Sequence, residues 1–299
     1  MTSSSEGAPR GVLRLGIPKG SLEQYTLELF ARSGWKISVG SRSYFPDVND
    51  PELALTISRA QEISRYVADG VLDAGITGRD WRLENDSDVV VVQELVYSKV
   101  SARPARWVLA VPGDGPVTEA SQLAGKTVAT ELPGVTSRWF RQRGLDVKVE
   151  FSWGATEAKA ASGLADAIVE VTETGSTIRA HGLRIIDEVL VTATELMANP
   201  RSLKDPFKKS KIGQIALLLK AALAADGMVG LKMNVRENDA ERLVEALPSL
   251  RAPTVAHLFR TDWLSVETVV SRSVVRDLIP ELLDRGAEGI IEYPLNKII

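Results

Sequence analysis

The chain contains no cysteine and only two histidines, His181 and His257, which excludes several kinds of site from the start. Without cysteine there is no disulfide, no thiolate-bound zinc and no cysteine nucleophile. Two histidines are too few for a multi-histidine metal centre. Any metal is therefore expected to be Mg²⁺, held by carboxylates and by the phosphates of a substrate.

The sequence also lacks the apolar runs and the charge excess of membrane and nucleic-acid proteins. No stretch is long enough to span a bilayer, and residues 1–10 are polar, without the apolar core of a signal peptide. We expect this segment to be a disordered tail and the protein to be cytoplasmic. The formal net charge of −3 gives no electrostatic footprint for nucleic acid or an anionic membrane. With 299 residues, 44% of them hydrophobic and 25% charged, the rest is expected to form two or three globular domains.

The most informative stretch runs from 163 to 182. Ala167–Val171 is a short β-branched apolar run, typical of a buried strand, and Thr-Glu-Thr-Gly-Ser-Thr follows it at 172–177. Such a loop can aim several backbone N–H groups and hydroxyls at one phosphate. Glu170 and Glu173 stand just before the Thr-Gly-Ser-Thr, and carboxylates suit a ribose diol or a Mg²⁺-pyrophosphate. The pattern favours a phosphoribosyl donor, although a strand followed by a polar surface turn would have the same composition.

Part of this pattern occurs twice. Gly-x-x-Asp-Ala begins at Gly70 and again at Gly163, and in each case a strand and then Thr-Gly follow. We therefore predict two similar α/β lobes, each with a polar loop at the carboxyl end of a strand, where open α/β sheets bind ligands. Lobe I is expected at 11–98, completed by 189–224, and lobe II at 99–188. Two crossings between the lobes predict the two-lobed fold of type II periplasmic binding proteins.

A lysine lies at a second candidate anion site. Lys19 stands between a strand, Leu13–Ile17, and a helix that Ser21 is predicted to cap, with Gln24 completing a capping box. A lysine in that position can meet an anion or simply lie in solvent. Ser58 is predicted to cap the next helix in the same way.

Residues 225–299 are predicted to form a separate unit of order β-α-β-β-α-β, a ferredoxin-like, ACT-like module. Its strands are expected at 231–235, 254–259, 264–270 and 289–293, and its helices at 238–247 and 273–285. A module this small gains stability from a neighbour, and such modules commonly bind small effectors where they pair. We expect it to be regulatory; a purely structural role in oligomerisation is the alternative.

Three motifs, in this order and spacing, resemble ATP phosphoribosyltransferase of histidine biosynthesis. They are Leu15–Gly20, Asp73–Trp81 and Glu170–Thr177. With the C-terminal unit the chain is similar to the long, self-regulated form. The resemblance implies transfer of the 5-phosphoribosyl group of phosphoribosyl pyrophosphate (PRPP) to N1 of ATP, with Mg²⁺, giving phosphoribosyl-ATP and pyrophosphate. It also implies inhibition by histidine at the C-terminal unit and a homo-oligomer, either a hexamer or a dimer.

The resemblance assigns roles residue by residue. Glu170 would orient the ribose diol and Lys19 would bind pyrophosphate or a nucleotide phosphate, which makes these two the candidate catalytic residues. The residues expected to contact PRPP are Glu170, Thr172, Glu173, Thr174, Gly175, Ser176 and Thr177. Those expected to contact ATP or line the cleft are Lys19, Gly20, Asp73, Gly75, Thr77, Gly78 and Asp80. No side chain is assigned to the metal, and no general base is named because adenine N1 needs no strong base before attack.

Two positions depart from the family pattern. Ser21 stands where the family often has arginine, and Glu170 stands where aspartate is common. Two other interpretations use the same two-lobed fold. One is a small-molecule-binding or sensor protein without catalysis, and the other is a prephenate-dehydratase-like enzyme with a similar tail. Neither explains acidic residues placed directly before a phosphate loop.

Overall fold

The computed structural model of the chain describes residues 11–40, 43–97, 104–248 and 252–299. It divides into two compact units, Met1–Leu217 and Leu218–Ile299. The tail expected at 1–10 and the lobe boundary expected between 98 and 99 lie outside the described residues. Of the helices in the described ranges, none has both the length and the apolar character that crossing a bilayer requires.

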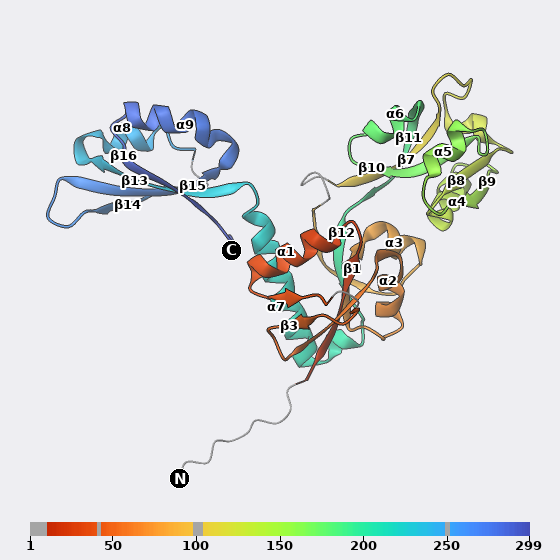
Figure 1. Cartoon of the computed structure of the whole chain (residues 1–299), viewed down its shortest axis with the longest axis horizontal. Helices are drawn as coiled ribbons and strands as arrows, with labels where there is room; N and C mark the ends of the chain where they lie inside the picture. Colours follow the sequence, from red (N-terminus) through yellow and green to blue (C-terminus); the bar gives the residue numbers. More distant parts are fainter. Residues whose placement is uncertain (1–10, 41–42, 98–103, 249–251) are drawn as a thin grey trace, which may run out of the picture. The chain divides into compact units, whose positions relative to one another are not determined.

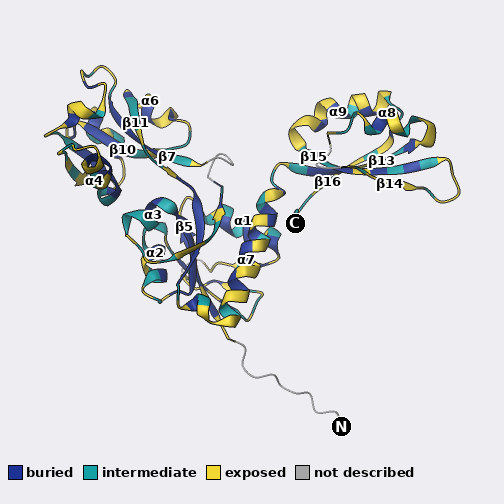
Figure 2. Ribbon diagram, turned by 180° about the vertical axis from the view of Figure 1, so that it is seen from behind, coloured by how far each residue is buried: buried dark blue, intermediate teal, exposed yellow. Residues whose placement is uncertain are grey.

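The first unit contains two sheets, of which lobe I holds the first. Its strands, in sheet order, are β4 (Leu53–Arg59), β1 (Leu13–Lys19), β5 (Ala74–Gly78), β12 (Thr194–Ala198) and β6 (Val90–Leu95). Its helices are α1 (Glu23–Ser33), α2 (Ala60–Ala68), α3 (Arg79–Glu84) and α7 (Pro206–Ala224), and β2 (Ile37–Ser38) and β3 (Asp47–Val48) form a small ribbon (Figure 1). β5 and β12 are buried along their whole length, as expected for strands covered on both faces (Figure 2).

Lobe II is built in the same way from a contiguous stretch of chain. Its strands, in sheet order, are β11 (Leu183–Thr192), β7 (Ala105–Pro112), β10 (Ala167–Thr172), β8 (Thr127–Thr130) and β9 (Lys148–Phe151). Its helices are α4 (Pro133–Gln142), α5 (Thr156–Ala161) and α6 (Ser176–Ala180), with a 3₁₀ turn at Ala120–Leu123. Trp107, Trp139 and Phe140 fill its core.

The two sheets have one topology. Lobe I has four strands of its own, which are β1, β4, β5 and β6 in chain order, and receives β12 from the chain returning from lobe II. From the β4 edge the sheet order is β4-β1-β5-β12-β6, that is, second, first, third, returning strand and fourth. Read from the β9 edge, lobe II repeats this order as β9-β8-β10-β7-β11. In each lobe the arriving strand, β12 or β7, is antiparallel to both neighbours. This confirms the predicted two-lobed type II periplasmic-binding-protein fold.

The repeated Gly-x-x-Asp-Ala has the same role in both lobes. Asp73 precedes β5; its carboxylate accepts the N–H of Arg14 at 2.9 Å, and its own N–H donates to the Arg14 carbonyl at 2.9 Å. Asp166 precedes β10 and exchanges the same two bonds with Thr127 of β8, both at 2.9 Å. The aspartate therefore ties the third strand to the first in each lobe, at the amino end of the strand.

Both predicted capping boxes are wrong. The residue before α1 is Leu22 and the residue before α2 is Arg59, and neither helix has a side-chain cap. At α2 the reason is that β4 continues to Arg59, so Ser58 is still paired with Pro18 of β1 when the helix begins. At α1 it is Glu23, not Gln24, that reaches back, accepting the N–H of Gly20 at 3.2 Å.

The return to lobe I also differs from the prediction. Lobe I is predicted to resume at 189, whereas β11 continues to Thr192 as one strand that pairs with β7 of lobe II throughout. Its register shifts between Ile185 and Asp187 and again between Glu188 and Leu190, and such bulges interrupt the alternation that a strand shows in sequence. The chain therefore returns to lobe I at Ala193 rather than at 189.

The second unit is the predicted ferredoxin-like module. Its antiparallel sheet has the order β14 (Thr254–His257), β15 (Trp263–Ser271), β13 (Met228–Arg236) and β16 (Glu288–Pro294). Helices α8 (Ala240–Val244) and α9 (Arg272–Asp284) cover one face (Figure 1). α8 is shorter than expected because a 3₁₀ turn at Glu237–Asp239 replaces its first residues.

Candidate active site

A cavity of about 850 Å³ is lined by residues of both lobes in the first unit. Lobe I contributes the segments that follow β1, β4 and β5, and lobe II contributes the loop after β10, so the cavity lies at the carboxyl ends of these strands. The predicted site residues that line it are Lys19, Gly20, Gly78, Asp80, Thr172, Glu173, Thr174, Ser176 and Thr177. Ligands of open α/β sheets bind at such an edge.

Five predicted site residues do not line this cavity: Glu170 and Gly175, which belong to β10 and to the loop after it, and the lobe I residues Asp73, Gly75 and Thr77. Asp73 is 1% exposed and accepts hydrogen bonds from Arg14, Ser202 and Lys208, the last at 2.8 Å. Gly75 faces α2, where a Cβ would lie 2.4 Å from a methyl group of Ile63. Thr77 is fully buried and donates its hydroxyl to the Ala60 carbonyl at 2.6 Å. Asp73, Gly75 and Thr77 therefore hold β5 in place within lobe I.

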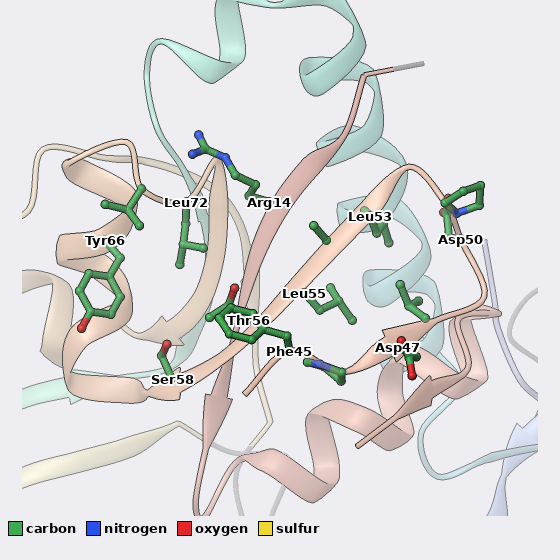
Figure 3. Close-up of a pocket in the computed structure, with 15 residues that line it drawn as sticks. Arg14, Phe45, Asp47, Asp50, Leu53, Leu55, Thr56, Ser58, Tyr66 and Leu72 are labelled. Carbon is green, nitrogen blue, oxygen red and sulfur yellow. The ribbon is translucent and has the colours of Figure 1, made fainter. Parts of the chain in front are cut away.

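A second cavity of about 720 Å³ lies along β4, and the segment that precedes this strand forms part of its wall (Figure 3). Its walls are largely apolar, with Leu53, Leu55 and Leu72 among them, and Phe45 at its rim. None of the predicted site residues lines it. No glycine is among the residues that line it, so it lacks the glycine- and hydroxyl-rich loop expected of a phosphate site.

The loop after β10 has the geometry expected of a phosphate cradle. Gly175 adopts φ 74°, a left-handed conformation that favours glycine, and turns the chain directly into α6. Its N–H donates to the Thr172 hydroxyl at 2.8 Å, and the hydroxyls of Thr174 and Ser176 lie 2.9 Å apart. The Arg179 guanidinium donates to the Thr174 carbonyl at 3.1 Å, which turns that acceptor away from an incoming anion.

Glu170 lies just behind this loop, next to other carboxylates. Burial raises its pKa to about 7, and repulsion from Glu157 and Glu131 adds to the shift. Hydrogen bonds from the Val171 N–H and the Thr156 hydroxyl oppose it. Glu131 lines the cavity itself, and burial raises its pKa as well. A half-buried acid of this kind becomes fully ionised when a cation or a developing positive charge arrives nearby.

Two cations of lobe I face this acidic group across the cavity. Lys19 and Arg59 are register partners at the ends of β1 and β4, and both line the cavity. Each lies over an exposed aromatic ring: Lys19 is 4.7 Å from the centre of the Tyr44 ring, and Arg59 is 5.4 Å from that of Trp153. Together they make the lobe I side attractive to a pyrophosphate or triphosphate.

Asp80 fixes the lobes at the base of the cavity. Its buried carboxylate accepts the indole N–H of Trp107, in lobe II, at 2.7 Å and the N–H of Trp81 at 3.0 Å. Burial raises the pKa of this acid. On the other side of α3, Glu84 accepts the N–H groups of Gly134 and Val135 at the start of α4, at 2.9 and 2.8 Å.

Sequence reasoning did not single out Arg59, Glu131 or Trp107 as cavity residues. Arg59 had a usable signal, since once β1 and β4 are neighbouring parallel strands the residue opposite Lys19 must share its edge. Glu131 and Trp107 had the same kind of signal within lobe II. Glu131 directly follows β8, the parallel neighbour of β10, and Trp107 lies opposite Val171 of β10 in the antiparallel β7.

Within the described ranges no group of three or more His, Cys, Asp or Glu side chains could hold a metal ion. Glu131 and Glu173 nevertheless present carboxylates to the cavity. That donor set suits a Mg²⁺ that keeps most of its water and is carried by substrate phosphates.

Two family models match the sequence. One, described as ATP phosphoribosyltransferase, covers residues 59–221, and the other, described as HisG, C-terminal domain, covers residues 225–297. These matches confirm the resemblance drawn from the three motifs and the long form with its C-terminal unit.

Individual relatives of the chain belong to the same family. An ATP phosphoribosyltransferase of Desulfatibacillum aliphaticivorans is 64% identical over 287 residues, which cover 96% of this chain and 98% of the relative. One from Desulfosudis oleivorans is 62% identical over 288 residues, covering 96% and 99%. Among solved structures, the ATP phosphoribosyl transferase (HisG:HisZ) complex from Thermotoga maritima superposes with a TM-score of 0.61 at 27% identity, covering 72% of this chain and 99% of that one.

Proposed function

The chain belongs to the ATP phosphoribosyltransferase family, and we propose that the cavity between its two lobes is where its substrates meet. The enzyme transfers the 5-phosphoribosyl group of PRPP to N1 of ATP, releasing pyrophosphate, the first step of histidine biosynthesis; it is a pentosyl-transferring glycosyltransferase. The observation that carries this placement is that the Thr172–Thr177 loop of lobe II and the cations Lys19 and Arg59 of lobe I line one cavity.

The 5′-phosphate of PRPP binds in the loop after β10. The hydroxyls of Thr174, Ser176 and Thr177 and the backbone around Gly175 supply its donors, since the left-handed turn at Gly175 leads straight into the first turn of α6. Glu173 lies on the cavity side and contacts the ribose or its metal ion. The bond from Arg179 to the Thr174 carbonyl supports this use of the loop, because it removes an acceptor that would repel phosphate.

Glu170 orients the ribose diol and stabilises the transition state. Displacement at ribosyl C1 develops oxocarbenium character, and a nearby carboxylate lowers the energy of that charge. The raised pKa of Glu170 supports the role, since a half-buried acid gains most from an arriving positive charge. Adenine N1 attacks without prior deprotonation, so catalysis comes mainly from positioning and charge neutralisation.

The pyrophosphate and the ATP phosphates lie on the lobe I side. Lys19 and Arg59 neutralise them, with Gly20 and Gly78 allowing close approach of the backbone. Mg²⁺ bound with the substrates would supply further charge neutralisation there, and Glu173 would help to hold it. Lys19 and Arg59 orient the substrate phosphates.

The second unit is regulatory in this proposal. Its ferredoxin-like sheet and its match to the family's C-terminal domain support histidine binding there as a feedback inhibitor. A homohexamer, with a dimer as the smaller form, is the assembly we propose, and the cytoplasm is the compartment because ATP and PRPP are made and used there. Neither nucleic acid nor a membrane is a partner in this proposal.

Glu170→Ala tests the site directly. We expect kcat/KM for PRPP to fall by about 10²-fold or more, because removing a charged hydrogen-bonding group from a closed site costs a few kcal/mol. Glu150→Ala is the matched control: it removes a carboxylate from the edge strand of the same lobe, where Glu150 pairs with Lys148 outside the cavity. A Glu170→Ala enzyme within threefold of wild type would remove Glu170 from the mechanism.

The assay itself tests the function. Purified protein is incubated with ATP, PRPP, Mg²⁺ and pyrophosphatase, and phosphoribosyl-ATP is followed by absorbance with and without millimolar histidine. Product suppressed by histidine supports both the transfer and the regulatory unit, and product without inhibition leaves the second unit structural. If no product forms and PRPP does not raise the melting temperature, the non-catalytic binding-protein interpretation replaces this proposal.

A further inference from the structure

A largely exposed tryptophan, Trp153, lies beside the cavity: it is not part of the cavity wall, but its ring lies next to Arg59, which is. Trp153 is 71% exposed, an unusual state for an indole on a folded chain. We propose that its ring is the surface on which the adenine base of ATP stacks. The inference rests on the proposed function and adds a residue that selects the acceptor substrate.

The loop that carries Trp153 is held rigidly. On one side of it Ser152 is fully buried and its N–H donates to the Thr130 carbonyl at 2.8 Å. On the other side Thr156 is fully buried and its hydroxyl is hydrogen-bonded to that of Ser152 at 3.1 Å. Between them, Ala155 has φ 48°, a left-handed conformation that a non-glycine residue keeps only where its surroundings impose it. The exposed ring is therefore a fixed feature of the surface.

The same loop is tied to the acidic side of the cavity. The Gly154 N–H donates to the carboxylate of Glu131, which lines the cavity, and Thr156 donates to Glu170. From lobe I, the cavity residue Arg59 lies 5.4 Å from the centre of the indole. The loop that carries the ring is thus bonded to the carboxylates assigned to the ribose, and the ring itself lies next to a cation assigned to the phosphates. A base held against the ring would be near both groups, as the acceptor nucleotide requires.

The chemistry of the ring fits an adenine. Its face attracts cations and stacks on flat aromatic bases, and Phe151, with its ring centre 5.5 Å away, extends the apolar surface. The three aromatic residues that line the cavity are committed elsewhere, and one of them, Trp81, packs edge-on against Trp107 with the ring centres 6.3 Å apart. Tyr97 is 4% exposed and stacked on Tyr25, and Trp107 is 2% exposed with its indole N–H bonded to Asp80.

Kinetics separate a stacking role from a general one. With PRPP and Mg²⁺ saturating, Trp153→Leu should raise KM for ATP about tenfold, and Trp153→Phe, which keeps a ring, should raise it less than about threefold. KM for PRPP and kcat should stay within about twofold in both. Because the side chain is exposed, the melting temperature should not change. Trp263→Leu is the matched control, since Trp263 in the second unit also lies under an arginine, Arg236, at 4.8 Å.

Binding without turnover gives an independent readout. Titration of the full-length protein with ATP alone should quench tryptophan emission in wild type and in Trp263→Leu, and most of that quenching should vanish in Trp153→Phe. An active Trp153→Leu enzyme with an unchanged KM for ATP overturns the inference, as does an equal rise in KM for ATP and PRPP.

Two further outcomes keep the inference and the proposed function apart. A specific rise in KM for ATP in Tyr44→Leu but not in Trp153→Leu would move the platform to the ring under Lys19 and overturn the assignment to Trp153. A wild-type protein that makes no product but shows quenching dependent on Trp153 would refute the transfer reaction while supporting the platform.

Discussion

β5 and β10 occupy equivalent places in the two lobes, yet their ends have become different structures. β5 runs to Gly78, whose φ is −74°, and α3 begins at the next residue. β10 runs to Thr172, and three more residues, ending in the left-handed Gly175, precede α6. Both contain Thr-Gly, but Thr77 is buried in the sheet whereas Thr174 is exposed on the loop.

The difference shows how one fold gives two kinds of half-site. In lobe I the helix begins directly at the strand end, and the lobe supplies cations from the neighbouring ends of β1 and β4. In lobe II the added loop is the segment that we propose binds the 5′-phosphate. A short sequence repeat thus identified equivalent strands correctly but did not identify equivalent functions.

The largest expected effect on activity is that of Gly175→Ala, with Gly163→Ala as its control. Both glycines have φ 74°, so both variants carry the same backbone strain, of about 1–2 kcal/mol. At Gly175 the new Cβ would also lie 2.8 Å from Arg179 and 3.1 Å from Ile185, whereas at Gly163 it meets nothing within 4 Å. We expect kcat/KM for PRPP to fall about 10²-fold in Gly175→Ala only, because the loop must shift. Equal kinetics for the two variants would contradict a phosphate role for the loop.

The next largest effect compares the repeated aspartates. Asp73 is buried with Arg14, Lys208 and Ser202, whereas Asp166 is exposed beside Lys126. Asp73→Asn should lower the free energy of unfolding by about 2 kcal/mol, since it leaves buried donors with a poorer acceptor, and Asp166→Asn by less than about 1 kcal/mol. Urea denaturation measures both. Under native conditions each variant should keep wild-type kcat and KM; a selective loss of activity in Asp73→Asn would return Asp73 to the site.

A third comparison concerns Glu170, whose counterpart by position in β5 is the uncharged Thr77. The pKa of Glu170 is raised from 4.5 to about 7 in the folded chain, so its protonated form is the one that folding favours. Its contribution to stability is therefore full below pH 4.5 and is lost as pH rises to about 7. Glu170→Gln should flatten the fall in unfolding free energy over this window by up to ~1.4 kcal/mol per pH unit. Thermal unfolding from pH 4 to 8 measures it, and parallel curves would contradict the raised pKa.

The parts of the site that sequence predicted are those encoded within a few neighbouring residues. The loop at 172–177 was visible because a hydroxyl-rich turn with one glycine is local chemistry, and Lys19 because it lies between a strand and a helix. Asp73, Gly75 and Thr77 were predicted for the cleft but lie inside the lobe, since residues before and within a strand need not reach its carboxyl edge.

What sequence did not predict depends on contacts between distant segments. Arg59 reaches the cavity through strand pairing, and Trp153 comes to lie beside Arg59 through a loop whose shape depends on buried neighbours. The predicted cap of α2 is wrong for a related reason, since Ser58 is still paired in the sheet. The fold class was predictable because strand and helix order survives such local errors.

The order of the strands along the chain has a consequence for how the protein is made. Lobe II is contiguous from β7 to β11, so all of its sheet is available as soon as Thr192 has been synthesised. Lobe I, although it begins earlier, has β12 between β5 and β6, and β12 is translated after the whole of lobe II. Because domains fold as their segments emerge from the ribosome, lobe II is able to fold first, and the amino-terminal half of lobe I waits with an unpaired β5 edge.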